Sequence, residues 1–278
     1  MFKILEKTSL NPTVSKMKVH APLIAKKVLP GQFIILRIDE KGERIPLTVF
    51  DHDFDKEYIE IIYQKVGLST MKLDQKKVGD YILDVAGPLG RPSIIEENKK
   101  AIVIAGGVGT AVAYPLAKEI KNKKGQVEII VGFRTKSLVI LENYINQIDP
   151  LASIVTDDGS YGRKGLVTDV LSEKLSKNPN YDTVIAVGPL PMMRAVCEVT
   201  KKYDVKTIVS MNSIMIDGTG MCGGCRLRVD GKVKFACIDG PDFDGHSVDF
   251  QEAIIRNRNF LEEEIKSKEK YCNLFKGV

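Results

Sequence analysis

The sequence predicts three units in order: a small antiparallel β barrel, a doubly wound parallel α/β sheet and a short cysteine-rich lobe. Three observations support this: turn-separated strands up to about residue 95, apolar strands alternating with helices from 101 to about 209, and glycines and cysteines crowded between 211 and 245. With 278 residues and 44% hydrophobic content, the chain exceeds what one core usually organises. We therefore expect domains at 1–97, 98–209 and 210–278.

The first unit is inferred from four short β-rich stretches. Short strands at regular spacing, with glycine and proline turns between them, are typical of an antiparallel barrel. The turns include Pro30-Gly31 and Lys41-Gly42. The expected strands are 33–38, 47–50, 58–63 and 81–85.

The second unit shows near-continuous apolar strands, as expected for a parallel sheet that is covered on both faces. The uncharged run 101–117 approaches the length of a membrane span, but Gly106, Gly107, Gly109 and Pro115 interrupt it. A buried strand, a glycine turn and a helix start explain the run better. The expected strands are 101–105, 127–131, 153–156 and 183–187, with helices over 166–175 and 191–200.

The third unit becomes amphipathic after its glycine-rich part. We expect a surface helix over 252–268, packed on its own chain or on a partner.

Composition excludes some functions. The net charge of +5 arises from 41 Lys and Arg among 36 Asp and Glu, without a basic stripe, so we do not expect nucleic-acid binding. The first residues lack the apolar stretch of a secretory signal. We expect a cytoplasmic protein that does not enter a membrane.

The strongest motif is Asp217-x4-Cys222-x2-Cys225-x11-Cys237. Except for its first position, it has the spacing of plant-type [2Fe–2S] loops, and its glycines allow the close backbone approach that such a cluster needs. Two alternatives are a structural zinc site, which usually has a second close cysteine pair, and a turn role for Asp217. Cys197 and Cys272 are isolated, and we expect small apolar fillers there.

Two weaker motifs in the first unit favour a flavin. The Arg44 guanidinium can bind a pyrophosphate bidentately, and Thr48 can reach the polar edge of the flavin ring. The segment 67–70 can offer amides and hydroxyls to the same phosphates, with a plain turn and helix cap as the alternative. The candidate residues are Arg44, Pro46, Leu47, Thr48, Ile62, Tyr63, Gly67, Ser69 and Thr70.

The glycine turn after the 101–105 strand opens a helix, where free amides favour a phosphate. It lacks the full G-x-G-x-x-G pattern, and the next strand ends at Arg134 rather than at an acidic residue, so NAD(H) and NADP(H) are both left open. Arg134 contacts a 2′-phosphate or caps its strand. The candidate residues are Gly106, Gly107, Gly109, Thr110, Arg134, Asp157, Asp158, Gly188 and Pro189.

These motifs, in this order and over essentially the whole chain, resemble the ferredoxin reductase superfamily. Within it the chain is similar to the electron-transfer subunit of dihydroorotate dehydrogenase. It is more similar to the small (alpha) subunit of electron-bifurcating NADH-dependent reduced ferredoxin:NADP oxidoreductase, also called sulfide dehydrogenase beta subunit. The strings D-G-T-G-M-C over 217–222 and K-F-A-C-I-D-G-P over 234–241 carry this likeness.

The resemblance implies FAD on the barrel, NAD(H) at the glycine turn and a [2Fe–2S] cluster on Asp217, Cys222, Cys225 and Cys237. It also implies a heterodimer with a larger subunit that carries a second flavin and [4Fe–4S] clusters, with ferredoxin reached through the complex.

We therefore expect an oxidoreductase in which hydride passes between NADH and FAD and single electrons pass to the cluster and the partner. The cofactors hold this chemistry. Val187 stands where many members of the superfamily have a cysteine, so no catalytic residue is nominated. The alternatives are a dihydroorotate dehydrogenase subunit, which Asp217 disfavours, and a non-catalytic zinc scaffold.

Overall fold

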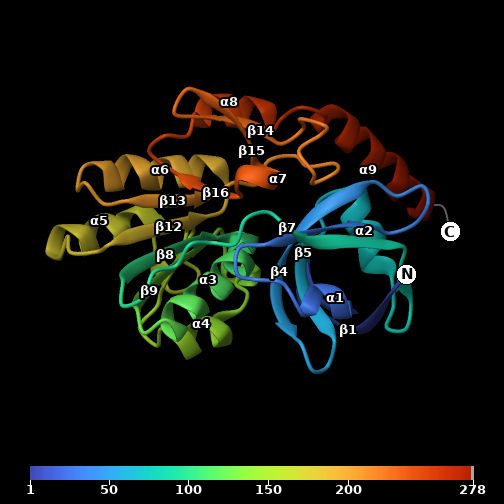
Figure 1. Ribbon diagram of the computed structural model, residues 1–278, viewed down its shortest axis with the longest axis horizontal. Coiled ribbons are helices and arrows are strands. Elements are labelled where there is room, and N and C mark those ends of the chain that lie inside the picture. The colour runs from blue at the N-terminus through green and yellow to red at the C-terminus, as the bar shows by residue number, and fades with distance from the viewer. Residues whose placement is uncertain (277–278) are drawn as a thin grey trace.

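The computed structural model describes residues 1–276, with side chains described for 1–270, so the expectation for Cys272 lies outside them. The described chain forms two seven-stranded sheets and one two-stranded hairpin. In Figure 1 the antiparallel sheet lies to the right and the parallel one to the left, and the C-terminal segment passes above both. The predicted fold class, a barrel followed by a doubly wound sheet and a small lobe, is confirmed.

The first sheet is antiparallel throughout, in the order β6-β1-β2-β5-β4-β3-β7. Its edge strands β6 and β7 are separated in the chain by Leu83 alone, so the sheet nearly closes into a barrel. The elements are β1 (Phe2–Asn11), β2 (Val14–His20), α1 (Pro22–Ala25), β3 (Phe33–Arg37), β4 (Arg44–Asp53), β5 (Tyr58–Gln64), α2 (Leu68–Gln75), β6 (Tyr81–Ile82) and β7 (Asp84–Leu89).

Strands β1 and β2 were not predicted. Charged residues alternate with apolar ones in both, which lowers the apparent strand signal although it is what a strand with one buried face requires. Met17 and Val19 are fully buried in the barrel. The alternating residues Lys16 and Lys18 instead form ion pairs with Glu60. The apolar residues of this alternation therefore face the barrel interior, and the charged residues face outward.

The second sheet has the order β11-β10-β9-β8-β12-β13-β16 and is parallel except for β16. The chain order reverses between β8 and β12, which is where ligands bind in open sheets of this kind. Helices α3 and α4 cover one face, and α5 and α6 cover the other (Figure 1). The elements are β8 (Lys100–Gly106), the 3-10 turn η1 (Gly107–Gly109), α3 (Thr110–Asn122), β9 (Gln126–Phe133), η2 (Lys136–Leu138), α4 (Glu142–Ile148), β10 (Ser153–Thr156), β11 (Arg163–Lys164), α5 (Val167–Lys177), β12 (Thr183–Val187), α6 (Leu190–Lys201) and β13 (Thr207–Ser210).

The four strands and two helices expected in this unit are present, and the run 101–117 forms strand, glycine turn and helix as expected. Within the described residues, no helix has the length and apolar content needed to cross a membrane.

The C-terminal segment is less independent than its composition indicates. Its strand β16 pairs with β13 and completes the second sheet. Its elements are β14 (Arg226–Val229), β15 (Lys232–Phe235), α7 (Ala236–Asp239), β16 (Asp242–Asp244), α8 (Phe250–Arg256) and α9 (Leu261–Lys276). The domain boundaries at 97/98 and 209/210 stay predictions.

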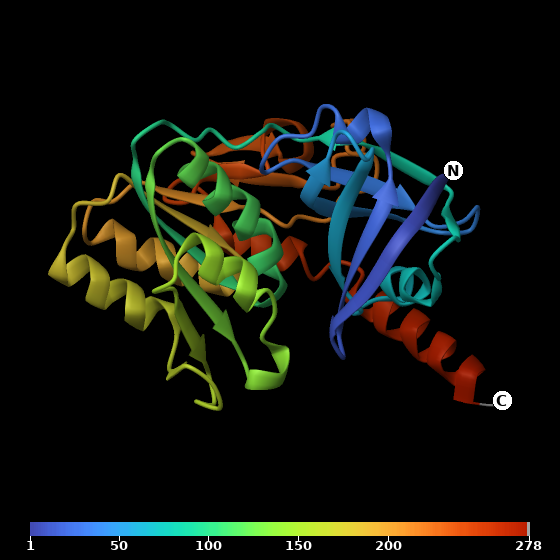
Figure 2. The ribbon, with the colours of Figure 1, turned by 90° about the horizontal axis from the view of Figure 1, so that it is seen from below.

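The continuous helix expected over 252–268 was wrong. Two helices occupy this region, and residues 257–260 form a turn in which Phe260 has a φ of 70°. Asn257 and Asn259 favour such a turn because their side chains compete with helical hydrogen bonding. The break lets α9 turn back along the barrel and contact α2, as Figure 2 shows.

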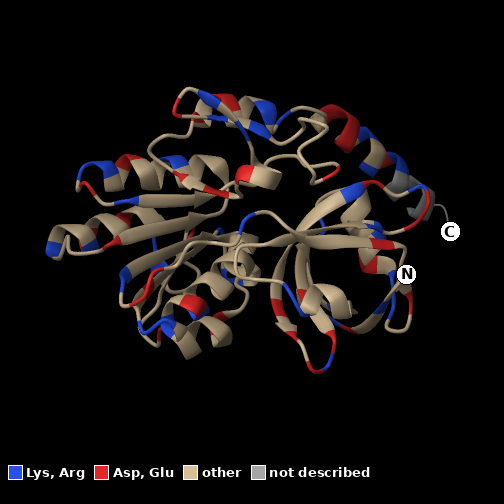
Figure 3. Ribbon diagram, in the orientation of Figure 1, with Lys and Arg blue, Asp and Glu red and all other residues tan. Residues whose placement is uncertain are grey.

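An aromatic cluster joins the barrel to the second sheet. Phe50 of β4 stacks on Tyr114 of α3 with centroids 5.0 Å apart, and Tyr144 of α4 meets both rings edge-on. Such pairs stabilise contacts beyond the area that they bury. Charges of both signs are interspersed over the helices (Figure 3), in agreement with the even distribution in the sequence.

Candidate functional site

Two of the predicted cluster ligands meet in the structure. Cys225 precedes β14 and Cys237 lies in α7, and the β14–β15 hairpin brings both sulfur atoms to a separation of 3.2 Å. Both side chains are buried, and the backbone amide of Cys237 donates to the Cys225 sulfur at 3.4 Å. Thiolates on one tetrahedral metal ion lie about 3.8 Å apart, so a small separation of the two side chains from 3.2 Å would let both bind one iron.

The other two predicted ligands form a second pair. The Asp217 carboxylate accepts the backbone amides of Thr219 and Cys222, each at 2.9 Å. The Thr219 amide, followed by the contacts with Cys222, lowers the pKa of the Asp217 carboxyl. Asp217 thus serves as a turn residue, yet its oxygens keep further lone pairs beside the exposed Cys222.

Burial and the neighbouring Cys225 thiol raise the pKa of Cys237. Metal binding requires thiolates, so loading this pair would release protons. Cys197, by contrast, is buried in the core of the second sheet, where burial raises its thiol pKa to about 12, in keeping with an apolar filler.

The cluster loop is pressed against the barrel. Gly218 has a φ of 74°, and a Cβ there would lie 2.7 Å from Ile35 of β3 and 2.7 Å from Leu89 of β7. Only glycine accommodates both the backbone conformation and the space. The linker after β7 adds a second contact, because Arg91 donates to the backbone oxygens of Gly240 and Ile238.

The residue types at this site suit a two-iron cluster. Within residues 1–270 no three His, Cys, Asp or Glu side chains converge to hold one metal ion. The candidate ligands lie in twos instead: the Asp217 carboxylate accepts the Cys222 backbone amide, and the sulfur atoms of Cys225 and Cys237 meet. Four ligands in two groups are what a two-iron cluster uses.

The flavin candidates lie on β4, β5 and the start of α2. Arg44 and Thr48 belong to the half of β4 that pairs with β3, and Arg44 is exposed. Tyr63 points the other way: its side chain is buried in the barrel and its hydroxyl donates to Asp74 at 3.2 Å. Burial and the Asp74 carboxylate raise the pKa of Tyr63, so its hydroxyl stays protonated and bonded to Asp74.

The start of α2 shows the helix cap that was the alternative for this motif. The Thr70 hydroxyl accepts the Gly67 amide at 3.2 Å and donates to the Gly67 oxygen at 3.0 Å. Ser69 donates to the Glu43 carboxylate at 3.2 Å, which places an anionic oxygen where the helix dipole favours one. Because Glu43 precedes Arg44, this contact brings the two flavin motifs together.

The nucleotide candidates meet at the ends of β8 and β12. A Cβ on Gly109 would lie 2.6 Å from the Val187 oxygen, and one on Gly188 would lie 3.0 Å from the Gly106 amide nitrogen. Gly107, with a φ of 55°, faces open space. The glycines thus let two loops touch while the space beside Gly107 stays open, which suits a phosphate at a switch point.

Thr110 and Pro189 support these loops. Thr110 is fully buried and its hydroxyl donates to the Gly107 oxygen at 2.8 Å, so it closes the turn. Pro189 precedes the first turn of α6 and would lie 3.0 Å from a Cβ on Gly106.

The remaining candidates lie at the ends of β9 and β10. The Asp158 amide donates to the Arg134 oxygen at 3.3 Å, and the Asp158 carboxylate accepts the Ser160 hydroxyl at 2.6 Å. Asp157, Asp158 and Arg134 are exposed side by side. A cation and two carboxylates thus lie together at the ends of β9 and β10.

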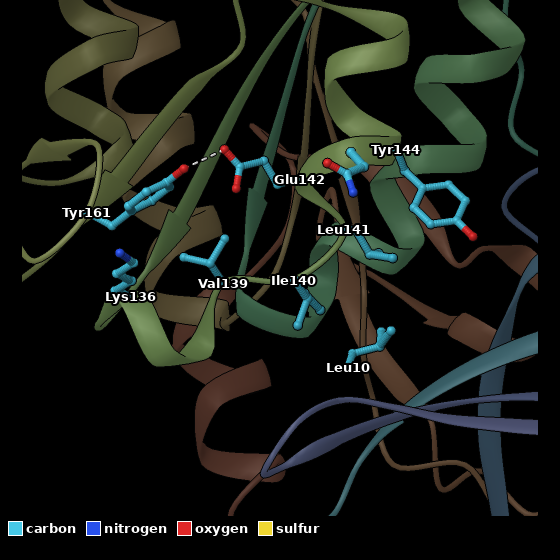
Figure 4. Close-up of a pocket in the computed structure, with 9 residues that line it drawn as sticks. Leu10, Lys136, Val139, Ile140, Leu141, Glu142, Tyr144 and Tyr161 are labelled. Carbon is cyan, nitrogen blue, oxygen red and sulfur yellow. Dashed lines mark hydrogen bonds between the residues drawn. The ribbon is translucent and has the colours of Figure 1, made fainter.

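A hollow of about 520 Å³ (Figure 4) contains none of the predicted residues, although its lining residues Lys136 and Tyr161 follow β9 and β10 closely in the chain. Its polar side chains include Lys136, Asn143 and Tyr144, and a Tyr161 hydroxyl that donates to Glu142 at 2.7 Å. The lining comes from the β1 end, η2, the start of α4 and the β10–β11 loop, so no local motif could have found it. It is formed by Leu10, Lys136, Val139, Ile140, Leu141, Glu142, Asn143, Tyr144 and Tyr161.

Two segments match known domain families. Residues 103–198 match the oxidoreductase NAD-binding domain, and residues 212–249 match the iron-sulfur cluster binding domain of dihydroorotate dehydrogenase B. The second match contains all four predicted cluster ligands.

Full-length relatives are similar over nearly the whole chain. A Clostridium beijerinckii protein described as an uncharacterized protein in the adh 3′ region is 45% identical over 96% of this chain and 93% of its own. A Thermotoga maritima homolog of the dihydroorotate dehydrogenase B (NAD(+)) electron transfer subunit is 42% identical over 95% of this chain and 96% of its own. A solved structure of NADH-dependent reduced ferredoxin-NADP oxidoreductase, studied for flavin-based electron bifurcation, has a chain 40% identical to this one, with a TM-score of 0.93 over 98% of both.

Proposed function

The chain belongs to the family of dihydroorotate dehydrogenase B electron transfer subunits, and we propose that it passes electrons between NAD(H), FAD and a [2Fe–2S] cluster to a larger subunit of a ferredoxin:NADP oxidoreductase. The chain is an oxidoreductase subunit with NAD-binding and iron–sulfur-binding parts. The observation that best supports this proposal is the contact between the thiols of Cys225 and Cys237. They belong to a lobe whose loop packs on the barrel at Gly218.

In this proposal Asp217 and Cys222 hold one iron while Cys225 and Cys237 hold the other. Loop amides near the sulfurs, such as Gly224 at 3.5 Å from the Cys222 sulfur, orient and stabilise the thiolates. The buried pair would keep water from one side of the cluster, whereas Cys222 is exposed.

Arg44 and the start of α2 are proposed to bind the FAD pyrophosphate, with Thr48 at the ring. FAD, when bound, accepts a hydride and releases electrons one at a time. The glycine turn at Gly107, which has open space beside it, is proposed to bind the dinucleotide phosphates, and the Gly106–Gly188 contact to support the nicotinamide end. Arg134, Asp157 and Asp158 are proposed to bind the end of the dinucleotide that lies away from the nicotinamide.

An exposed apolar rim supports a partner at the cluster. Around Cys222, the side chains of Met221, Ile216 and Ile238 are 86%, 49% and 43% exposed. Exposed apolar residues gathered at one site mark interaction surfaces. We propose that the larger subunit, with its own flavin and [4Fe–4S] clusters, covers this rim, and that ferredoxin reacts through the complex.

The test is to purify the chain with its native partner under anaerobic conditions. We expect FAD, iron and sulfide, a binuclear signal in electron paramagnetic resonance after reduction by NADH, and electron exchange with NADPH and ferredoxin. Reduction by dihydroorotate instead would assign the chain to the dihydroorotate dehydrogenase alternative. Zinc without iron, in colourless protein, would refute both.

A further inference from the structure

Arg256, the last residue of α8, reaches across to the cluster loop. Its Nε donates to the Arg226 oxygen at 3.1 Å and a terminal nitrogen donates to the Gly224 oxygen at 3.4 Å. These two carbonyl groups flank Cys225, so the guanidinium spans the backbone of a proposed cluster ligand. Only arginine presents two N–H groups in a rigid planar fork of this kind.

The helix that carries Arg256, α8, is held in place by several contacts. Asp249 caps α8 by accepting the Glu252 amide at 2.9 Å, and its own amide donates to the Arg228 oxygen at 2.9 Å. Phe250 and Ala253 are buried on the same helix. The helix is therefore tied to β14, which begins one residue after Cys225, and Arg256 moves with the loop that it contacts.

The Arg256 charge is not neutralised by a neighbouring carboxylate. On α8 the acidic Glu252 pairs with Arg228 at 3.2 Å, and within residues 1–270 no ion pair includes Arg256. Cations commonly sit in the last turn of a helix to interact with its own carbonyl groups. Arg256 instead directs both hydrogen bonds at Gly224 and Arg226, outside its helix.

We propose that Arg256 is a positioning residue that holds the Cys222–Cys225 turn and, through its positive charge, raises the reduction potential of the [2Fe–2S] cluster. This rests on the proposed function. Reduction adds one negative charge to the cluster, and a nearby fixed cation stabilises that form more than the oxidised form. By binding the carbonyl groups, the guanidinium also keeps the loop in the conformation that turns the Gly224 amide toward sulfur.

The test compares Arg256→Met and Arg256→Lys with a matched control, Arg258→Met. Arg258 lies two residues further and is exposed, and within residues 1–270 it hydrogen-bonds only through its backbone, to Ile255 and Leu261. The measurement is the cluster midpoint potential, followed by electron paramagnetic resonance during a redox titration of the holoprotein. Circular dichroism checks that each variant is folded.

We expect Arg256→Met to lower the midpoint potential of the cluster by about 59 mV, which is a tenfold change in the equilibrium constant of a one-electron couple. Arg256→Lys should keep the potential near that of the wild type but broaden the signal, because lysine retains the charge without the fork. Loss of the cluster in Arg256→Met alone also supports the positioning role. Equal potentials and signals in Arg256→Met and Arg258→Met would overturn the role of Arg256, and so would loss of the cluster in both variants. A wild-type protein without a binuclear centre would instead refute the proposed function.

Discussion

Gly109 packs so closely on Val187 that an added Cβ would lie 2.6 Å from the Val187 carbonyl oxygen. The contact joins the turn after β8 to the end of β12, on both sides of the switch point. Gly109→Ala must push these loops apart, because neither backbone can yield as a flexible side chain would. We expect NAD(H) affinity to fall at least tenfold with FAD content unchanged, as measured by fluorescence titration with NADH. An unchanged NADH affinity in a folded variant would contradict this site.

Cys225→Ser should remove the binuclear signal while NADH still bleaches the FAD spectrum. The serine hydroxyl is a weaker iron donor than thiolate, and Cys237 loses its partner at 3.2 Å. Cys197→Ser is the matched control, since Cys197 is buried on α6, outside the 217–237 segment, and it should keep iron and sulfide. Iron analysis and electron paramagnetic resonance decide the outcome, and a retained signal in Cys225→Ser would exclude it as a ligand.

Arg44→Ala should weaken FAD binding by roughly tenfold to a hundredfold, because a hydrogen bond to a charged group contributes about 1.5–3 kcal/mol. Arg37 stands opposite Arg44 in the β3–β4 register and is already paired with Asp84. Arg37→Ala therefore removes the same charge nearby and should leave FAD bound. Retention of FAD after gel filtration measures the difference, and equal retention by both variants would argue against the pyrophosphate role.

Asp74 should stabilise the barrel most strongly above acidic pH. It accepts hydrogen bonds from Ser15 at 2.7 Å and Tyr63 at 3.2 Å and pairs with Lys7 at 3.2 Å. Burial opposes ionisation, but Ser15 and Lys7 together lower the pKa of the Asp74 carboxyl. Its stabilisation is thus complete above the unfolded value, about 3.9, and is lost as the pH falls through the lower folded pKa.

In urea unfolding at pH 7, Asp74→Asn should cost about 1–3 kcal/mol, and the cost should shrink in acid. Asp55→Asn, on an exposed turn, is the control and should change little. A pH-independent cost would show that the charge of Asp74 is not involved.

Asp242 should have the opposite pH dependence. Its carboxyl is buried, Oδ1 has no hydrogen-bond partner, and Oδ2 accepts the Ser93 hydroxyl. Burial raises the pKa of Asp242. The folded state therefore holds a proton that the unfolded chain releases, and stability falls as the pH rises from about 3.9 through the raised folded pKa.

Asp242→Asn should lose this slope and gain relative stability toward neutral pH. Asp230→Asn, at an exposed position with φ of 50° that asparagine tolerates, is the control. Urea midpoints between pH 4 and 8 measure the slope, and parallel curves for the wild type and Asp242→Asn would contradict the prediction.

Strands such as β8 and β12 could be predicted because both faces are covered and nearly every residue is apolar. Strands β1 and β2 could not, because their outward residues are charged, and β16 is too short to show a period. The break at 257–260 was missed because an apolar pattern continues on both sides of it, and Asn257 and Asn259 alone do not outweigh that pattern.

The sequence by itself determined the features that depend on neighbouring residues: the ligand spacing from Asp217 to Cys225, the glycine turn at 106–109 and the alternation of strands and helices. Only the tertiary structure decided that Cys225 meets Cys237, that Gly109 meets Val187 and that Arg256 spans the cluster loop. The reason is that local backbone geometry is set within a few residues, whereas these contacts depend on which strands pair and on where each helix packs.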